Sequence, residues 1–204
     1  VGDALGLFRS WVSASASAGG TFDVGPYEIE QIFLNEVDAQ GQCRRSEIFG
    51  VDRLGDAIVR LYERYAELLP AGPERNRVAA TARSIAVSMG PLDLDRVVSA
   101  MAPAAEFLDH RIVGIGSVHG AEAFRDALRT LFEVADDIAN RVDDVLGLRS
   151  GAVLLRVTNF GTEHAGGGTY ERPFLMLWVF GADGLVTRME QFDVGHEAEA
   201  LARF

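Results

Sequence analysis

The chain of 204 residues matches itself at a constant offset of 143 positions. Segment 27–61 aligns with segment 170–204 without a gap, and eleven of the 35 aligned residues are identical. The identical pairs include Tyr27/Tyr170, Gly41/Gly184, Glu47/Glu190, Phe49/Phe192 and Ala57/Ala200. Similarity at a fixed offset indicates two copies of one structural unit. The alternative is that two unrelated β-hairpins, each followed by a helix, look alike.

The repeat predicts two domains of unequal length. Residues 1–70 are expected to be a partial copy of strands and a closing helix, and residues 74–204 a complete copy. With a two-residue slip, residues 1–7 also match 142–148, so we expect the first copy to begin inside its strands. A sheet that lacks its helices exposes an apolar face. We therefore expect the amino-terminal part to lean on the second unit, on another chain or on residues outside this sequence, and the start at Val1 indicates a fragment.

Alternating and helical spacings of apolar residues predict the elements. In the first unit we expect strands over 8–16 (weakly), 27–37 and 43–51, a turn over 19–25, a hairpin turn at 38–41, and a helix over 54–68. In the second unit we expect helices after Pro73 and Asp93, a strand over 106–113, a helix from Gly120 that still includes Ala135 and Ile138, strands over 143–148, 152–159, 170–180 and 185–193, and a helix over 196–204. This order predicts an α+β fold in which a curved antiparallel sheet wraps around helices and leaves a cone-shaped pocket.

Charge and composition exclude several classes of protein. The chain has 19 basic and 30 acidic residues, and a net charge of −11 repels phosphate backbones, so nucleic acid is not expected as a partner. The longest apolar run, Phe174–Phe180, is far shorter than the ~20 residues that cross a bilayer, so we expect no membrane span. Cys43 is the single cysteine, and no histidine or cysteine cluster has metal spacing. We therefore predict a cytoplasmic protein without a metal or a cofactor.

Three motifs stand in the second unit. They are Glu106-Phe107-Leu108-Asp109-His110-Arg111, Gly120-x-x-Ala123-Phe124 and Arg188-x-Glu190-x-Phe192-Asp193. Together with the element order, they resemble the SnoaL-like branch of the nuclear-transport-factor-2-like superfamily, over residues 92–204 and, as the back half of a second copy, over 1–68. The resemblance implies a cone-shaped fold that hosts isomerases, cyclases, dehydratases, epoxide hydrolases and non-catalytic modules. In its general character the sequence is also similar to tail domains that are fused to signalling or transcription regulators in actinobacterial proteins.

The resemblance implies a general base at the end of the first strand of the complete copy, at Asp109, His110 or Arg111. We choose His110, because histidine titrates near neutral pH and could accept a proton from a carbon acid or activate water. Strand alternation would then place His110 on the face of Leu108 and turn Asp109 and Arg111 to the other face. The alternative is a partly exposed strand end at which Asp109 and Arg111 form an ion pair.

Carbon-acid chemistry also needs donors that stabilise the developing oxyanion. Glu190 or Tyr170 is the candidate for this role. Glu47 occupies the place of Glu190 in the other copy, so a structural role for both carboxylates is the competing interpretation.

A set of residues near the expected pocket is assigned to ligand binding. The set comprises Arg111, Tyr170, Met176, Trp178 and Gln191. Both faces of the strand over 170–180 are apolar, so we expect helices or the pocket to cover one face and a second sheet to cover the other. This predicts a homodimer, or an intrachain pseudo-dimer, that forms through sheet faces.

Two functions follow from these observations. We favour a non-catalytic module that binds a small apolar ligand or mediates association, as part of a larger regulatory protein. The alternative is an enzyme similar to the SnoaL-like or ketosteroid-isomerase-like proteins, with His110 as the base. A His110 side chain that points into an apolar cavity would favour the enzyme.

Overall fold

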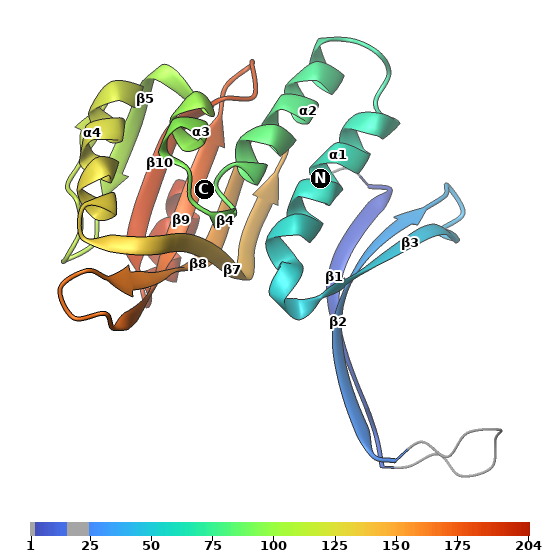
Figure 1. The fold of residues 1–204 in the computed structure, drawn as a ribbon. Helices are drawn as coiled ribbons and strands as arrows, with labels where there is room; N and C mark the ends of the chain where they lie inside the picture. Colours follow the sequence, from blue (N-terminus) through green and yellow to red (C-terminus); the bar gives the residue numbers. More distant parts are fainter. Residues whose placement is uncertain (1–2, 16–24) are drawn as a thin grey trace.

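The computed structural model describes residues 3–15 and 25–204 (Figure 1). Residue 1, the end of the predicted strand over 8–16 and most of the predicted turn over 19–25 lie outside the described residues. In the described part of the chain, no helix combines the length and the apolar character that a bilayer crossing needs.

The amino-terminal unit is a three-stranded antiparallel sheet with one long helix. The strands lie side by side in the order β1 (Leu5–Ala14), β2 (Tyr27–Val37) and β3 (Cys43–Gly50). A 3-10 turn, η1 (Val51–Arg53), leads into α1 (Leu54–Leu68). The predicted strand over 27–37 and the predicted helix over 54–68 are confirmed. Gly41 closes the β2–β3 hairpin at φ +75°, a left-handed backbone that favours glycine.

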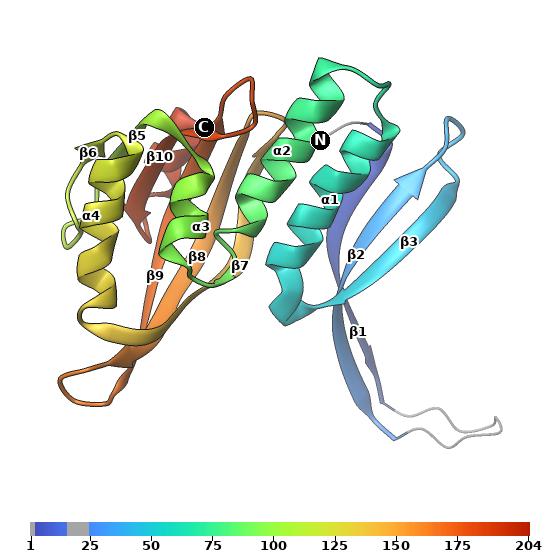
Figure 2. The same ribbon diagram turned by 45° about the horizontal axis from the view of Figure 1, so that its top comes forward.

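The second unit is built on a seven-stranded curved sheet, with α3 and α4 on one side of it (Figures 1 and 2). Its elements are α2 (Pro73–Ala86), β4 (Gly90–Pro91), α3 (Leu94–Ser99), β5 (Met101–Asp109), β6 (Val118–His119), α4 (Ala121–Phe132), β7 (Ala135–Arg149), β8 (Ala152–Glu163), β9 (Thr169–Phe180), β10 (Val186–Asp193) and α5 (Glu197–Arg203). The strand order is β4-β7-β8-β9-β10-β5-β6, and only the β5–β10 pair is parallel. The predicted α+β fold with a curved antiparallel sheet is confirmed, apart from the parallel β5–β10 pair.

The predicted bounds of several elements are wrong, and those of β5 and α4 differ most. β5 starts at Met101 instead of 106, and it ends at Asp109 instead of 113. Pro103 lies inside this strand, where the ladder to β10 shifts register and no backbone N–H is required. α4 ends at Phe132, so Ala135 and Ile138 belong to β7. Ala135 and Ile138 are three positions apart, which is a helical spacing, yet both are buried on a strand. They can be, because β7 shifts its register against β8 after Asp136.

The two hairpins pair in the same register at the offset of 143 residues. Gln31 faces Gly50 in the first hairpin, and Phe174 faces Asp193 in the second. Both ladders shift register at equivalent points, between β2 residues 36 and 37 and between β10 residues 186 and 188. β1 pairs with β2 as β8 pairs with β9, so the match of 1–7 to 142–148, which lies on β7, is wrong. That the two hairpins are copies of one domain stays a prediction.

Each unit packs its closing helix on the same face of its hairpin. In the second unit Leu175, Phe192 and Ala200 form a buried cluster under α5. At the offset of 143 they correspond to Ile32, Phe49 and Ala57, which pack together under α1. The second apolar face of β9 is therefore covered by α5. The expectation that a second sheet covers it is wrong.

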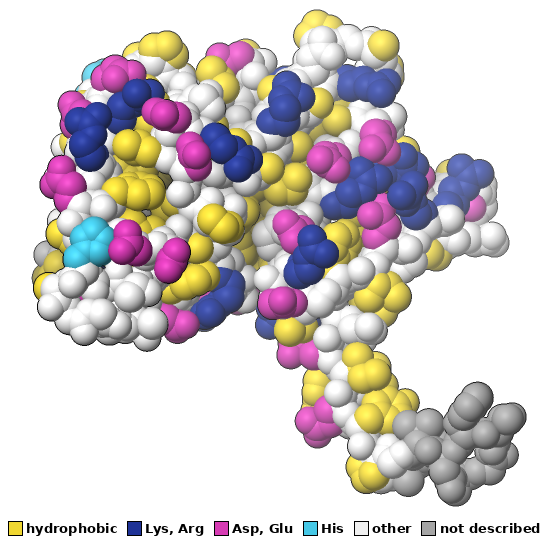
Figure 3. All heavy atoms as spheres, viewed as in Figure 1, with side chains coloured by type: hydrophobic (Ala, Val, Ile, Leu, Met, Phe, Trp, Pro, Cys, Tyr) yellow, Lys and Arg dark blue, Asp and Glu magenta, His cyan; other side chains and the backbone are white. Residues whose placement is uncertain are grey.

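The opposite face of β1–β3 is uncovered. Phe8, Phe33 and Ile48 lie beside one another on it, and Phe8 and Ile48 are 46% and 56% exposed. Figure 3 shows hydrophobic side chains at the surface along the projecting hairpin of β1 and β2. The two units meet through α1 and α2, which lie between the sheets, and Tyr62 of α1 donates a hydrogen bond to the carbonyl of Arg149 (Figures 1 and 2). An intrachain pseudo-dimer through sheet faces is thus not what the structure contains.

The β9–β10 turn packs closely against α2. Gly184, at φ +78°, rests on α2 and accepts a hydrogen bond from the Ser84 hydroxyl. A Cβ on Gly184 would lie 2.5 Å from the Ala80 Cβ and 2.7 Å from the Arg77 carbonyl oxygen. Gly41 occupies the same place in the first hairpin, at φ +75°, and a Cβ there would contact nothing within 4 Å.

We predict that Gly184→Ala lowers the free energy of unfolding by more than Gly41→Ala does. Both variants carry left-handed strain of about 1–2 kcal/mol. Only Gly184→Ala adds the overlap with α2, about 1–3 kcal/mol more. Urea denaturation of the two variants and the parent chain measures the difference. Equal losses would show that the turn does not rest on α2.

Candidate functional site

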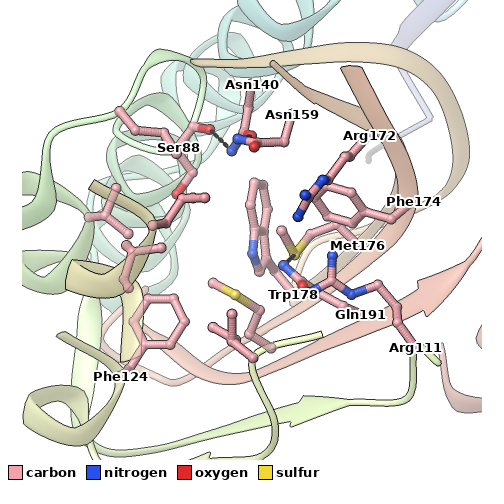
Figure 4. Close-up of a pocket in the computed structure, with 16 residues that line it drawn as sticks. Ser88, Arg111, Phe124, Asn140, Asn159, Arg172, Phe174, Met176, Trp178 and Gln191 are labelled. Atoms are coloured by element: carbon pink, nitrogen blue, oxygen red, sulfur yellow. Dashed lines mark hydrogen bonds between the residues drawn. The ribbon is translucent and has the colours of Figure 1, made fainter. Parts of the chain in front are cut away.

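A cavity of about 100 Å³ lies between the helices of the second unit and the concave face of its sheet (Figure 4). Its lining consists of Ser88, Leu92, Val97, Arg111, Ile115, Phe124, Leu128, Leu131, Asn140, Asn159, Arg172, Phe174, Met176, Trp178, Met189 and Gln191. α3 and α4 contribute the apolar wall, and β9 and β10 contribute the facing wall. The site therefore combines a mostly apolar interior with a few polar groups, as small-molecule sites do.

Strand alternation selects which residues of β9 and β10 face the cavity. Phe174, Met176 and Trp178 of β9 share a face with Met189 and Gln191 of β10, because Trp178 pairs with Met189 and Met176 pairs with Gln191. All five line the cavity. The intervening residues turn to the other face, where α5 covers them.

Two arginines lie at the Phe174 end of the cavity. Arg111 follows β5, and its guanidinium stacks 5.1 Å from the centre of the Phe174 ring. Its Nε and Nη2 donate to the two carboxylate oxygens of Asp109, at 2.8 and 2.9 Å. Arg172 on β9 stacks over Tyr170, and among the described residues no carboxylate forms an ion pair with it. We call this end the entrance, because Arg172 is exposed there. It carries one arginine paired with Asp109 and one that forms no ion pair with a described carboxylate.

The Asp109 side chain is 1% exposed, and both of its carboxylate oxygens accept hydrogen bonds. Besides the Arg111 side chain, the backbone N–H groups of Arg111 and Ile115 donate to it. Burial works to raise the pKa of Asp109, but the hydrogen bonds from Arg111 and Ile115 outweigh it and hold the pKa below its usual range. Asp109 is therefore a charged anchor for the loop after β5 and is poorly suited to accept a proton.

An amide network forms the wall near β7 and β8. Asn159 Nδ2 donates to Asn140 Oδ1 at 2.9 Å, and the Tyr170 hydroxyl donates to Asn159 Oδ1 at 3.0 Å. Asn140 in turn donates to the backbone carbonyl of Ser88. Burial raises the pKa of Tyr170, which lines a neighbouring hollow with Arg172 and not the main cavity. These groups are satisfied by one another and give the wall a fixed shape.

Two polar atoms at the floor of the cavity have no hydrogen-bond partner among the described residues. They are Nε1 of Trp178, whose side chain is 2% exposed, and Oε1 of Gln191. The Gln191 amide nitrogen makes only a long contact to the Met176 sulfur. A buried donor or acceptor without a partner costs about 1–3 kcal/mol, so the floor is ready to accept a group that satisfies both atoms.

His110 and Glu190 lie outside this cavity. The His110 ring stacks on Phe192, with centroids 4.6 Å apart, and its Nε2 is 2.8 Å from Oε2 of Glu190. Phe192 belongs to the cluster under α5, so the pair lies on the opposite face of the sheet from the cavity. The predicted alternation of Asp109, His110 and Arg111 agrees with this placement, and Arg111 is the member that reaches the cavity.

Glu190 is the centre of an ion cluster that recurs in the first unit. Its carboxylate lies 3.1 Å from Nε of Arg188 and 3.1 Å from Nη1 of Arg203. In the first unit Glu47 is bound in the same way by Arg45 and Arg60, at 2.9 and 3.1 Å. The recurrence in both units supports the structural interpretation of Glu190.

The sequence-based set of ligand residues falls in or beside the cavity. Arg111, Met176, Trp178 and Gln191 line it, and Tyr170 lies next to it. Sequence reasoning missed Arg172, Asn140 and Asn159. Arg172 stands two residues before Phe174 on the same strand face, so alternation could have identified it; the two asparagines carry no pattern of their own. The described residues contain no group of three side chains that could hold a metal ion.

We predict that Glu190→Gln lowers the free energy of unfolding by about 3 kcal/mol, because it breaks a buried ion cluster. The Glu190 side chain is fully buried, whereas that of Glu47 is 23% exposed. Glu47→Gln, the matched control, should cost about 1 kcal/mol or less. Chemical denaturation of both variants measures the two losses, and a Glu190→Gln chain as stable as the parent would contradict the structural role.

Comparison with known proteins gives one family and several similar folds. A family model described as a SnoaL-like domain matches residues 82–189. No curated protein matches the chain.

Three solved structures show the range of similar folds. A hypothetical protein with a ketosteroid isomerase-like fold from Catenulispora acidiphila, in complex with trimethylamine, is 10% identical, with 56% of this chain and 85% of that chain covered and a TM-score of 0.46. RV0760c from Mycobacterium tuberculosis, in complex with estradiol-17beta-hemisuccinate, is 13% identical, with coverages of 60% and 95% and a TM-score of 0.45. An NTF2-like protein from Burkholderia pseudomallei is 17% identical, with coverages of 64% and 96% and a TM-score of 0.43.

The family match begins inside α2, so it does not include the three-stranded unit, and the partial repeat is not confirmed by it. The match does include α3, α4, β5 and β7 to β9, which build most of the cavity. Since it spans more than half of the sequence, the chain belongs to the SnoaL-like domain family.

Proposed function

We propose that this chain is a binding module that holds a small, largely apolar molecule in the cavity between α3, α4 and the concave face of β8–β10. The observation that carries the proposal is the cavity itself, with an apolar wall from the helices and polar groups confined to its floor and entrance. Such a distribution favours ligands with an apolar body and a few polar groups.

The lining supports binding more than acid–base catalysis. A general acid or base must gain or lose a proton near the operating pH and lie within reach of the ligand. The polar members of the lining are arginine, asparagine, glutamine, serine and tryptophan side chains, none of which does so near neutral pH. The competing enzymatic function needs His110 as a base, and His110 with Glu190 lies on the other face of the sheet.

The cavity size limits the ligand. An apolar cavity of about 150 Å³ in another protein holds one benzene molecule. The present cavity, at about 100 Å³, is smaller, so it holds at most about one ring, and any further part of the ligand extends out through the entrance.

We expect Leu131→Trp to weaken the binding of benzyl alcohol by at least about tenfold, because the larger side chain fills the cavity. Leu131 belongs to α4 and lines the cavity. Leu201→Trp is the control, since Leu201 is exposed on α5. Ligand-detected NMR titration gives the affinities. The proposal fails if benzyl alcohol and larger apolar fragments do not bind the parent chain, or if they bind Leu131→Trp as well as the parent.

We also propose that the uncovered face of β1–β3 associates with the same face of a second copy. Phe8, Val12, Ile29, Phe33 and Ile48, which lie on this face, are all uncharged. An uncharged face can meet its own copy across a two-fold axis without like-charge repulsion. Exposed apolar surface of this kind marks contact sites.

Ile48→Glu should convert a dimer to a monomer, because it places a charge against its own symmetry mate. Ile112→Glu is the control, since Ile112 is exposed in the loop after β5. Sedimentation velocity over a range of concentrations measures the mass. A parent chain that stays monomeric at all concentrations, or an Ile48→Glu chain that still dimerises, would refute the association.

A cytoplasmic location is part of the same proposal. Cys43 is a free, exposed thiol, which suits a reducing compartment.

A further inference from the structure

We propose that the ligand of this cavity is a small hydroxylated aromatic carboxylate, held by arginine at the entrance and by Trp178 and Gln191 at the floor. This inference rests on the proposed function, since it names the class of ligand that the same cavity would take. Three features of the lining specify the carboxylate, the hydroxyl and the aromatic ring of this ligand.

The anion is specified by the two arginines at the entrance. Figure 4 shows the side chains of Arg111 and Arg172 directed toward the cavity from the loop after β5 and from β9. Nε and Nη2 of Arg111 donate hydrogen bonds to Asp109, which holds the guanidinium over Phe174. Nη1 has no protein partner among the described residues. Arg172 forms no ion pair with a described carboxylate. Two guanidinium groups with only one carboxylate between them favour a second carboxylate, supplied by the ligand.

The hydroxyl is specified by the two unpartnered atoms at the floor. Trp178 Nε1 can only donate a hydrogen bond, and Gln191 Oε1 can only accept one. The two residues are diagonal neighbours on one face of the β9–β10 pair, since Trp178 pairs with Met189 and Met176 pairs with Gln191. A hydroxyl both accepts and donates, so one such group placed between the two atoms would satisfy both.

The ring is specified by the wall between floor and entrance. Phe124 of α4 and Met176 of β9 lie on different walls of the cavity in Figure 4, and Leu128 and Met189 also line it. Methionine sulfur packs favourably on aromatic ligands. The volume of about 100 Å³ allows one ring and not a fused ring system. An aromatic ring with a carboxylate at one end and a hydroxyl at the other connects the two polar regions.

The test uses three probes that differ by one group. They are 4-hydroxybenzoate, benzoate, which lacks the hydroxyl, and 4-hydroxybenzyl alcohol, which lacks the charge. Isothermal titration of the full chain at pH 7 should give the tightest binding for 4-hydroxybenzoate, with each of the other two weaker by about tenfold. Raising the salt concentration from 0.05 to 0.5 M should weaken the two carboxylates and not the neutral alcohol.

Two substitutions separate the two ends of the site. Arg172→Gln removes the exposed entrance charge without leaving a buried partner and should weaken 4-hydroxybenzoate about tenfold while leaving 4-hydroxybenzyl alcohol unchanged. Arg44→Gln is the matched control, because Arg44 is exposed on β3 in the other unit. Trp178→Phe keeps an aromatic ring but removes the N–H, so it should reduce the preference for 4-hydroxybenzoate over benzoate.

The outcomes distinguish this inference from the proposed function. If the neutral alcohol binds as tightly as 4-hydroxybenzoate and Arg172→Gln changes neither, the carboxylate inference is overturned while the binding module stands. If benzoate binds as tightly as 4-hydroxybenzoate, the role of Trp178 and Gln191 is overturned. If no probe and no other apolar fragment binds, the proposed function itself fails.

Discussion

The antiparallel register between β9 and β10 is the constraint on which the rest of the second unit depends. It aligns Met176 with Gln191 and Trp178 with Met189, so that one face of the pair lines the cavity. The residues between them, which include Leu177 and Glu190, then face α5. A slip of one residue would exchange the two sets and place a buried ion cluster in the cavity. The chemistry of the cavity and the cluster around Glu190 are thus separated by the thickness of one sheet.

The same pairing occurs twice in the chain with different consequences. In the second unit, α3 and α4 cover the concave face and leave a cavity; in the first unit, the equivalent face of β1–β3 has no such helices and stays exposed. The α5 and α1 sides of the two units are alike, down to a glutamate held by two arginines. What differs between the units is therefore the cover of one face, and that difference leaves a cavity in one unit and an exposed apolar surface in the other.

Much of the fold could be predicted from the sequence because local patterns determine it. The apolar patterns over 27–37 and 54–68 predicted the bounds of β2 and α1 to the residue. Ala135 and Ile138 were assigned to a helix because a register shift in β7 reproduces a spacing of three. Such a shift depends on the partner strand, so the sequence of β7 alone does not reveal it.

The site residues that strand alternation places could be predicted from the sequence. Those that depend on how strands pair with one another could not. Trp178, Met176 and Gln191 follow from strand faces, and Arg172 could have been found by the same argument. Whether the end of β5 presents His110 or Arg111 to the cavity depends on its pairing with β10, where Asp109 lies opposite Gln191. The network of Asn140 and Asn159 depends on the β7–β8 register, which no local motif encodes.

The central claim, that the concave face of β9 and β10 holds a ligand, can be tested with the two indole groups of the chain. Trp178 lies at the floor of the cavity, whereas Trp11 is 63% exposed on β1, far from it. In a ¹⁵N-edited NMR titration with 4-hydroxybenzoate, the account predicts that the indole N–H resonance of Trp178 shifts in a saturable manner while that of Trp11 stays fixed. A saturable shift of Trp11 alone, or binding without any change at Trp178, would contradict it.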